Sequence, residues 1–214
     1  IKRKEETDML FDILAIISTV SVIILMRRLL NIYPSLLACI IRWKESINLE
    51  ASVKHSLDRN MFAVAMIIPF CLIVYRFGIY SPAFMEGINE TFSLLIIIGI
   101  FGAYFALRRA MIRIMRPKKM NPKTYKAAIC CAYTFFIILT LTLFFVGGIM
   151  ALLKTDPIVT RTAIIWLSAI IYGIYIFRKT QIFTSSCSIF RGFLYLCGLE
   201  IFPTGVLIAS ALIL

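Results

Sequence analysis

A carboxylate stands inside the last apolar stretch of the chain, where it is the residue best placed to do chemistry. Residues 193–214 form an apolar run of about 20 residues, long enough for a helix to cross a hydrocarbon core of about 30 Å, and Glu200 lies within it. A carboxylate there costs roughly 3 kcal/mol on the insertion scale, so it normally faces protein or water rather than lipid. Pro203 follows and cannot donate a backbone hydrogen bond to the carbonyl of Leu199.

Two interpretations of Glu200 remain open from the sequence. In the first, it is a site for a proton, a cation or a substrate. In the second, it is a structural contact, in which a salt bridge or a protonated carboxyl holds helices together. Arg178, Arg108 and Arg109 all begin near the same membrane interface, and a long arginine can bend inward to meet the carboxylate. Arg178 is the first choice because its helix directly precedes the last one.

A second pair of charges is predicted near the opposite interface. Asp12 enters the first apolar run near one end. Arg76 lies near the corresponding end of the second run, which crosses in the other direction. Both side chains are therefore expected at similar depth, and we predict an Asp12–Arg76 pair.

Motifs for metal, cofactor or covalent chemistry are absent from the sequence. His55 is the only histidine, which excludes paired-histidine haem ligation and an HExxH zinc site. The sequence has no GxSxG elbow, no phosphate loop and no GxGxxG motif. The six cysteines include no CxxC pair and are expected to be small buried hydrophobic residues. We therefore expect no cofactor, no metal and no enzymatic activity. A lipid-active enzyme using Glu200 or Asp12 is the remaining catalytic alternative.

The composition predicts an all-α polytopic transmembrane bundle that forms one domain over residues 1–214. Of these residues 61% are apolar, and the mean hydropathy is +0.92, whereas apolar residues make up about half of a soluble domain. The pattern predicts six spanning helices, at 9–28, 61–80, 91–112, 127–153, 160–178 and 193–214.

The segments between the first two spans are expected to lie outside the hydrocarbon core. Residues 29–43 are apolar but short, and Pro34 interrupts them. An interfacial helix lying along the membrane fits them best, and a continuation of the first helix beyond a kink is the alternative. Residues 44–60 are the most hydrophilic loop.

The basic residues are unevenly distributed, and this predicts the orientation. The formal charge is +12, and 17 of the 23 Lys and Arg residues fall in 27–60, 108–126 and 178–191. Because positive residues concentrate on the cytoplasmic side, these three segments are predicted to face the cytoplasm, with both ends of the chain outside. Topology and anionic lipid headgroups explain the charge better than nucleic acid does.

The segment 108–126 carries eight positive side chains and no acid. It is expected to bind anionic lipid headgroups or the acidic face of a protein partner. A simple determinant of topology is the alternative. The candidate residues are Arg108, Arg109, Arg113, Arg116, Lys118 and Lys119.

Two stretches near the C-terminus carry a family resemblance. They are YGIYIFRK, from Tyr172 to Lys179, and FRGFLYLCGLEIFP, from Phe190 to Pro203, joined by a short serine-containing loop. With them, the C-terminal third resembles an uncharacterised integral-membrane family of Bacteroidota, described as a domain of unknown function. The resemblance implies an inner-membrane protein of a diderm bacterium and no particular activity. It marks Arg178, Tyr195, Glu200 and Pro203.

The expected function is that of a non-enzymatic inner-membrane protein, a subunit or accessory of a cell-envelope complex for secretion or transport. Gly99 with Ala103, and Gly102 with Ala106, are small-xxx-small pairs that permit close helix approach. One alternative is a small transporter or channel with Glu200 as its coupling carboxylate. The other is a lipid-handling protein. A dry Glu200 paired with arginine favours assembly, an open polar vestibule favours transport, and lipid bound along 108–126 favours lipid handling.

Overall fold

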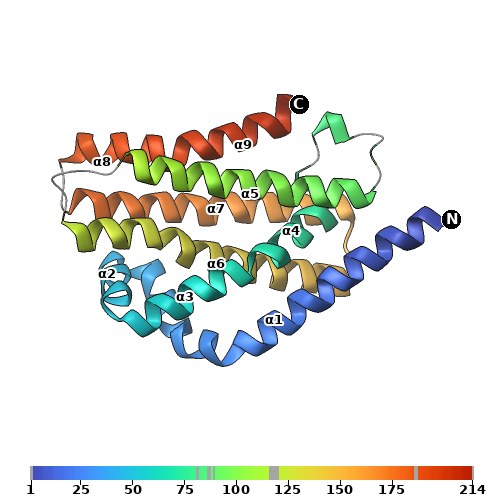
Figure 1. Ribbon diagram of the computed structural model, residues 1–214, viewed down its shortest axis with the longest axis horizontal. Helices are drawn as coiled ribbons and strands as arrows, with labels where there is room; N and C mark the ends of the chain where they lie inside the picture. Colours follow the sequence, from blue (N-terminus) through green and yellow to red (C-terminus); the bar gives the residue numbers. More distant parts are fainter. Residues whose placement is uncertain are drawn as a thin grey trace.

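The chain folds into a bundle of long helices, as the composition predicts. The computed structural model describes residues 2–80, 82–85, 88, 90–115, 121–185 and 188–213, and these contain no strand (Figure 1). Six helical stretches in this part are long and apolar enough to cross a membrane. They are Phe11–Ile41, Val53–Arg76, Phe92–Ile114, Pro122–Leu152, Pro157–Thr184 and Ile189–Ala211.

The first helix is longer than predicted. α1 runs without a break from Lys2 to Ile41 and contains Pro34, so 29–43 is not a separate interfacial helix. Burial gives the reason, because Ile32 and Leu36 pack with Phe62 in the core of the bundle. A helix can continue through a proline with a kink, and Figure 1 shows the second half of α1 turning toward α2.

The prediction of a hydrophilic loop at 44–60 is also wrong, because these residues form helices. α2 covers Trp43–Ala51, and α3 covers Val53–Ala65. Several of their polar side chains bind one another. Glu50, whose side chain is 5% exposed, accepts charged hydrogen bonds from Arg59 at 2.8 Å and from Lys126 at 2.7 Å. This cluster joins α2 and α3 to α6, and it lets a hydrophilic sequence pack into the bundle.

The second span begins eight residues before its predicted start at 61. α4 (Ile67–Arg76) follows α3 after a turn at Met66, and the two together make one stretch from Val53 to Arg76. Pro69 lies in the first turn of α4, where a missing N–H does little harm. The short 3₁₀ helix η1 (Ala83–Met85) then leads to α5 (Glu90–Ile114).

The next two spans begin with the same capping chemistry. α6 covers Pro122–Leu152 after Asn121, whose side chain accepts a hydrogen bond from the N–H of Lys123. α7 covers Pro157–Thr184 after Asp156, which caps the N–H of Ile158. Proline at the first helical position needs no donor, so both starts are favourable. α7 ends six residues beyond the predicted end at 178, and Lys179 is therefore inside it.

The last span is interrupted by a π-helical turn. α8 covers Ile189–Leu196, the π-turn η2 covers Cys197–Ile201, and α9 covers Phe202–Ile213. The N–H of Phe202 bonds to the carbonyl of Cys197, five residues back. Pro203 follows at once. The break predicted at Pro203 thus takes the form of an added residue in the preceding turn.

Close helix approach occurs at other glycines than those predicted. A Cβ on Gly147 would lie 2.8 Å from the Phe77 ring, so a larger residue there would require this ring to move. Gly99 and Gly102 are exposed, and a Cβ on either would meet nothing within 4 Å. The small-xxx-small pairs of α5 therefore make no close contact within the described bundle.

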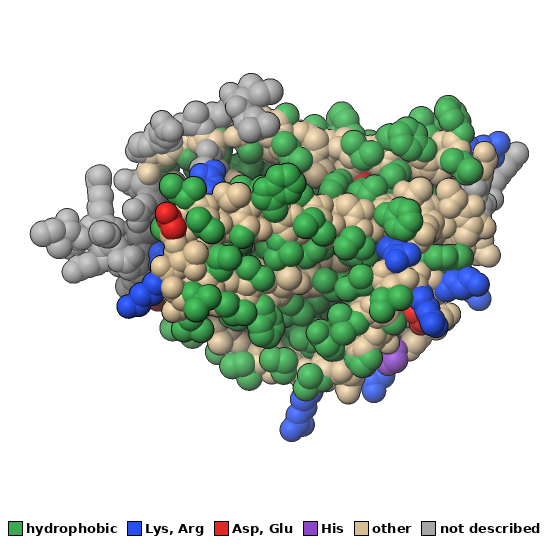
Figure 2. Space-filling view, turned by 180° about the vertical axis from the view of Figure 1, so that it is seen from behind, with side chains coloured by type: hydrophobic (Ala, Val, Ile, Leu, Met, Phe, Trp, Pro, Cys, Tyr) green, Lys and Arg blue, Asp and Glu red, His purple; other side chains and the backbone are tan. Residues whose placement is uncertain are grey.

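The two-sided arrangement expected from the charges is present in the fold. Figure 1 places α2, the end of α5, the start of α6, the end of α7 and the start of α8 at one end, with the start of α1 at the other. Figure 2 shows hydrophobic side chains across the middle of the rear face and basic side chains at both ends, with more of them toward the end that carries α2. The described parts of the segments 27–60, 108–126 and 178–191 thus lie toward one end.

We predict that Glu50→Gln lowers the free energy of unfolding by about 2 kcal/mol, because hydrogen bonds between charged groups are lost. Burial alone would raise the pKa of Glu50, but hydrogen bonds from Lys126 and Arg59 lower it below its usual value. This stabilisation is present above the unfolded pKa of about 4.3. It is lost as the pH falls through the lower folded value.

Denaturant titration in micelles from pH 7 to pH 3 measures the effect. The difference between wild type and Glu50→Gln should shrink toward the acid end. Glu45→Gln is the matched control, because among the described residues the side-chain hydrogen bond of Glu45 is to Asn48, at 3.3 Å, on the same helix. Equal losses for the two variants at pH 7 would contradict the account.

Candidate functional site

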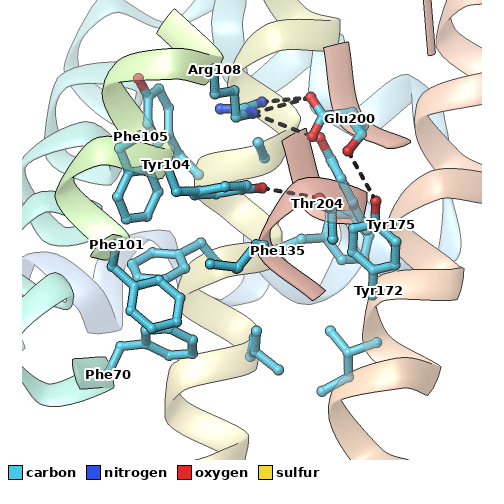
Figure 3. A pocket seen from close by; sticks show the side chains of 16 residues that line it. Phe70, Phe101, Tyr104, Phe105, Arg108, Phe135, Tyr172, Tyr175, Glu200 and Thr204 are labelled. Carbon is cyan, nitrogen blue, oxygen red and sulfur yellow. Dashed lines mark hydrogen bonds and ion pairs between the residues drawn. The ribbon is translucent and has the colours of Figure 1, made fainter. Parts of the chain in front are cut away.

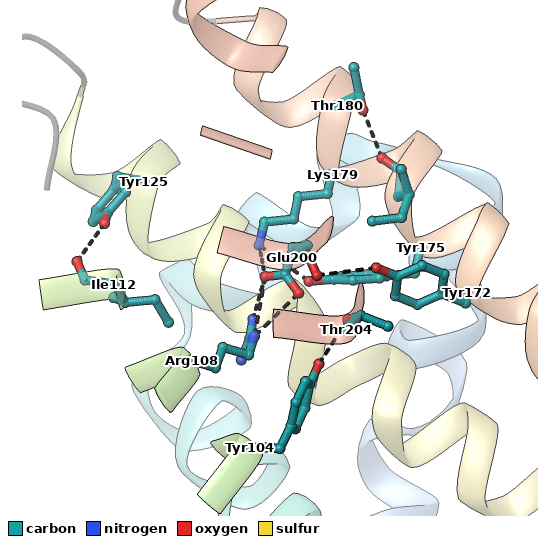
Figure 4. A network of polar contacts seen from close by, with 11 residues as sticks. Tyr104, Arg108, Ile112, Tyr125, Tyr172, Tyr175, Lys179, Thr180, Glu200 and Thr204 are labelled. Carbon is teal, nitrogen blue, oxygen red and sulfur yellow. Dashed lines mark hydrogen bonds and ion pairs between the residues drawn. The ribbon is translucent and has the colours of Figure 1, made fainter. Parts of the chain in front are cut away.

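Glu200 lies in the interior of the bundle and is bound by two cations from other helices (Figure 4). The Nη2 of Arg108, on α5, donates to Oε1 at 2.8 Å, and its Nε lies 3.2 Å from Oε1 and 3.3 Å from Oε2. The Nζ of Lys179, on α7, also donates to Oε1. Glu200, Lys179 and Arg108 are 1%, 0% and 5% exposed. We call these three residues the charge triad.

Matching depth brings the triad together. Arg108 lies six residues before the end of α5 at Ile114, roughly 9 Å at 1.5 Å per residue. Lys179 lies five residues before the end of α7 at Thr184, roughly 8 Å along the axis. Both helices end at the same side of the bundle (Figure 1). Glu200 is in the π-turn of the last span at that level.

Hydroxyl groups surround the triad. Lys179 Nζ donates to the Tyr175 hydroxyl at 3.2 Å and lies over the rings of Tyr175 and Phe183, at 5.6 and 5.7 Å from their centroids. The Tyr172 hydroxyl donates to the backbone carbonyl of Glu200 at 3.4 Å. A π-turn changes the partners of the backbone hydrogen bonds. The Tyr172 hydroxyl therefore supplies a side-chain donor to a backbone carbonyl where the helix is interrupted.

The charges of the triad do not cancel. Two cations face one carboxylate, so one positive charge is in excess when all three groups are ionised. Charged groups away from water are tolerated only when they are paired and hydrogen-bonded. The Tyr175 hydroxyl accepts a hydrogen bond from the second cation, and the ring of Phe183 stabilises this cation through its π face. The arrangement therefore connects α5, α7 and the last span by charged hydrogen bonds.

A cavity borders the triad on its apolar side (Figure 3). Its volume is about 170 Å³, slightly more than a 150 Å³ apolar cavity known to hold benzene. Aromatic rings form most of the wall, and Figure 3 shows Phe70, Phe101 and Phe105 on the side away from Glu200. Tyr104 and Thr204 line it near the triad, with their hydroxyls 3.3 Å apart. One end of the cavity is polar and the other is apolar.

The prediction that Arg178 is the partner of Glu200 is wrong. Its Nε donates to the carbonyl of Ile40 at 2.8 Å, and its Nη1 donates to Gln181 Oε1 at 2.8 Å. Neighbouring residues on a helix point about 100° apart, so Arg178 faces α1 while Lys179 faces the interior. Arg108, expected both as an inward-bending arginine and as a headgroup ligand, is the arginine that meets Glu200.

Lys179 is the functional residue that sequence reasoning missed. The predicted fifth span ends at 178 and leaves this lysine just outside it. A signal for it is present in the sequence, because Tyr175 and Lys179 are four residues apart and share a helix face only if the helix continues past 178. The capping residue Asp156 sets the start of α7, but no glycine or proline between 179 and 184 marks its end.

The other candidate residues lie outside the triad. No ion pair between Asp12 and Arg76 is present in the described part of the chain, and both are exposed. Their neighbours Phe11 and Tyr75 are in ring contact, with centroids 6.2 Å apart. Asp12 and Arg76 therefore lie at similar depth, as predicted, but they do not form the predicted pair.

Of the predicted headgroup ligands, Arg109 and Arg113 are exposed on α5. Arg116, Lys118 and Lys119 lie outside the described residues. Where side chains are described, no group of three or more His, Cys, Asp or Glu residues is placed to hold a metal ion.

Comparisons of the chain with protein-family models, with curated proteins and with solved structures find no significant match. The resemblance to the Bacteroidota family therefore remains a prediction. The class of protein is defined by the fold alone, as a multi-pass helical membrane protein.

We predict that losing the carboxylate of Glu200 costs more stability than losing the ammonium group of Lys179. Glu200→Gln leaves two buried cations without a counter-charge and should cost about 3–5 kcal/mol of unfolding free energy. Lys179→Met keeps the Arg108–Glu200 pair and removes the excess charge, so it should cost less than about 1.5 kcal/mol.

Unfolding titrations in mixed micelles measure both variants. Arg109→Met is the control, because it removes an exposed cation beside Arg108 and should change stability by less than about 0.5 kcal/mol. A loss for Lys179→Met equal to that for Glu200→Gln would show that both cations are required.

Proposed function

We propose that the protein is a non-enzymatic component of a larger complex in the bacterial inner membrane. The observation that carries this proposal is the state of Glu200, which is 1% exposed and bound by Arg108 and Lys179. A carboxylate held in this way stabilises a fixed arrangement of α5, α7 and the last span. The segments 27–60, 108–126 and 178–191 face the cytoplasm in this proposal, because they carry most of the basic residues.

The outer face of α5 supports an assembly role. Gly99, Gly102, Ala103 and Ala106 are all exposed, so the small side chains make a smooth stripe along one helix face. No other part of the described bundle would come within 4 Å of a Cβ added to Gly99 or Gly102. In membranes, such stripes let a second helix approach closely, and van der Waals packing then drives association. A transmembrane helix of a partner protein is the occupant that we propose for this stripe.

Gly102→Leu together with Ala103→Leu should abolish assembly without unfolding the protein. Leucine favours the helix by close to 1 kcal/mol relative to glycine, so stability should not fall. The measurement is the amount of the partner recovered in stoichiometric yield after purification from the native membrane in mild detergent. Gly173→Leu on α7 is the control, because Gly173 is also exposed with open space around it. Purification of the wild type as a lone monomer would contradict the proposal.

A small transporter or channel is the second candidate, and the cavity beside Glu200 favours it. Discontinuous helices often form ion sites in transporters, and the last span is interrupted at the π-turn Cys197–Ile201. In this alternative, Glu200 exchanges a proton and leaves its cations during the cycle.

A membrane-permeant carbodiimide separates the two candidates without a mutation. Such reagents modify protonated, accessible carboxyl groups. If Glu200 is fixed as a salt bridge, mass spectrometry after treatment should find it unmodified, whereas Asp12, which is exposed on an apolar helix, serves as the reactive control. Modification of Glu200 at a rate similar to that of Asp12 would support the transporter and contradict the structural role.

A further inference from the structure

A groove lies on the outer side of Arg108, distinct from the aromatic cavity. Its volume is about 280 Å³, and α3, α4, α5 and α6 all contribute to its walls. Val64 and Ile67 form one side, Ala106 and Arg109 form the other, and Tyr133 of α6 contributes to the lining between them. Val64 is 64% exposed. The groove is therefore accessible from the surface that the bilayer covers.

The charge of the groove is positive. Arg109 is exposed, and Arg108 lines both the groove and the aromatic cavity. The bonds of Arg108 to Glu200 use Nε and Nη2, and within the described residues Nη1 has no hydrogen-bond acceptor. Among the described residues, no Asp or Glu lines the groove. When all three groups of the triad are ionised, its excess positive charge adds to that of Arg109 at this position.

The rest of the groove is apolar. Ile67 and Ala106 offer only hydrocarbon surface, and the rings of Phe105 and Phe136, with centroids 5.5 Å apart, line both the groove and the aromatic cavity. A free inorganic anion would bind the arginines but would make no contact with the apolar walls. A molecule with an anionic end and one hydrocarbon chain satisfies both parts of the groove.

We propose that this groove binds an anionic amphiphile, a single hydrocarbon chain that ends in a carboxylate or a phosphate. The anionic end lies between Arg109 and the Nη1 of Arg108, and Tyr133 belongs to the same lining. The chain lies along Val64 and Ile67. Arg109 is five residues before the end of α5, roughly 8 Å along the helix, which is the depth of a headgroup just inside the interface. The site does not depend on the proposed subunit role.

The experiment uses the full chain in nanodiscs of zwitterionic lipid. Val64→Trp, in a background with Trp43→Phe and Trp166→Phe, places one fluorophore in the groove. The probe is a twelve-carbon carboxylate with bromine on the chain, and quenching of the tryptophan gives its affinity. The corresponding brominated alcohol tests the charge, and brominated propionate tests the chain. We expect the alcohol to bind at least tenfold more weakly than the carboxylate, and brominated propionate not to quench.

Two pairs of variants test the location. Arg109→Gln should weaken binding of the carboxylate about tenfold, whereas Arg113→Gln, an exposed arginine one turn away that does not line the groove, should change it less than twofold. Ala106→Phe should fill the groove and weaken binding by a similar factor, whereas Ala110→Phe, at an exposed alanine of α5 that does not line the groove, should not. Neither arginine carries a structural bond in the described chain, so both variants should fold.

Three results would overturn the proposal. Equal affinity for the alcohol and the carboxylate would show that the arginines play no part. Equal losses for Arg109→Gln and Arg113→Gln would show general attraction to a basic surface. Unchanged binding in Ala106→Phe would place the chain elsewhere.

Discussion

The burial of one carboxylate constrains much of this bundle. Glu200 lies in the last span, away from water, and an ionised carboxylate there needs donors from the protein. Arg108 reaches it from α5 and Lys179 from α7, and both bonds require these helices to end at the same side of the bundle. The π-turn and the Tyr172 hydroxyl support the backbone at the same place. Helix register, depth and orientation are thus fixed by one charged group.

A second charged cluster performs a similar task at the end that carries α2. Glu50 binds Arg59 and Lys126, and this connects the short helices α2 and α3 to the start of α6. Glu50, like Glu200, faces two cations, but the two clusters differ in where the second cation lies. Lys126 is 64% exposed to solvent, whereas Lys179 is 0% exposed. Of these two clusters, the one at Glu200 therefore holds its second cation inside the protein. Next to it lie an apolar cavity and a basic groove, and each can accommodate a membrane-soluble molecule.

The sequence predicts the helices well and their polar contacts poorly. Apolar runs of spanning length locate all six spans, since length and hydropathy act locally. The predictions for 29–43 and 44–60 are wrong because the structure of these segments depends on partners far away in the sequence. Ile32 packs against Phe62, and Glu50 forms an ion pair with Lys126. The need for a cation beside Glu200 follows from the free-energy cost of burying a carboxylate. The choice of Lys179 over Arg178 depends on where α7 ends and which way each side chain points, which a single sequence does not specify.

The ionisation state of Glu200 tests the central claim most directly. Isotope-edited infrared spectroscopy of the protein in lipid, with wild type compared against the conservative Glu200→Asp variant, can assign the bands of this one side chain. Two cations within hydrogen-bonding distance predict the symmetric and antisymmetric stretches of a carboxylate, unchanged when the outer solution is moderately acidified. The carbonyl stretch of a protonated carboxyl at neutral pH would contradict the account, because the cations would then lack their counter-charge.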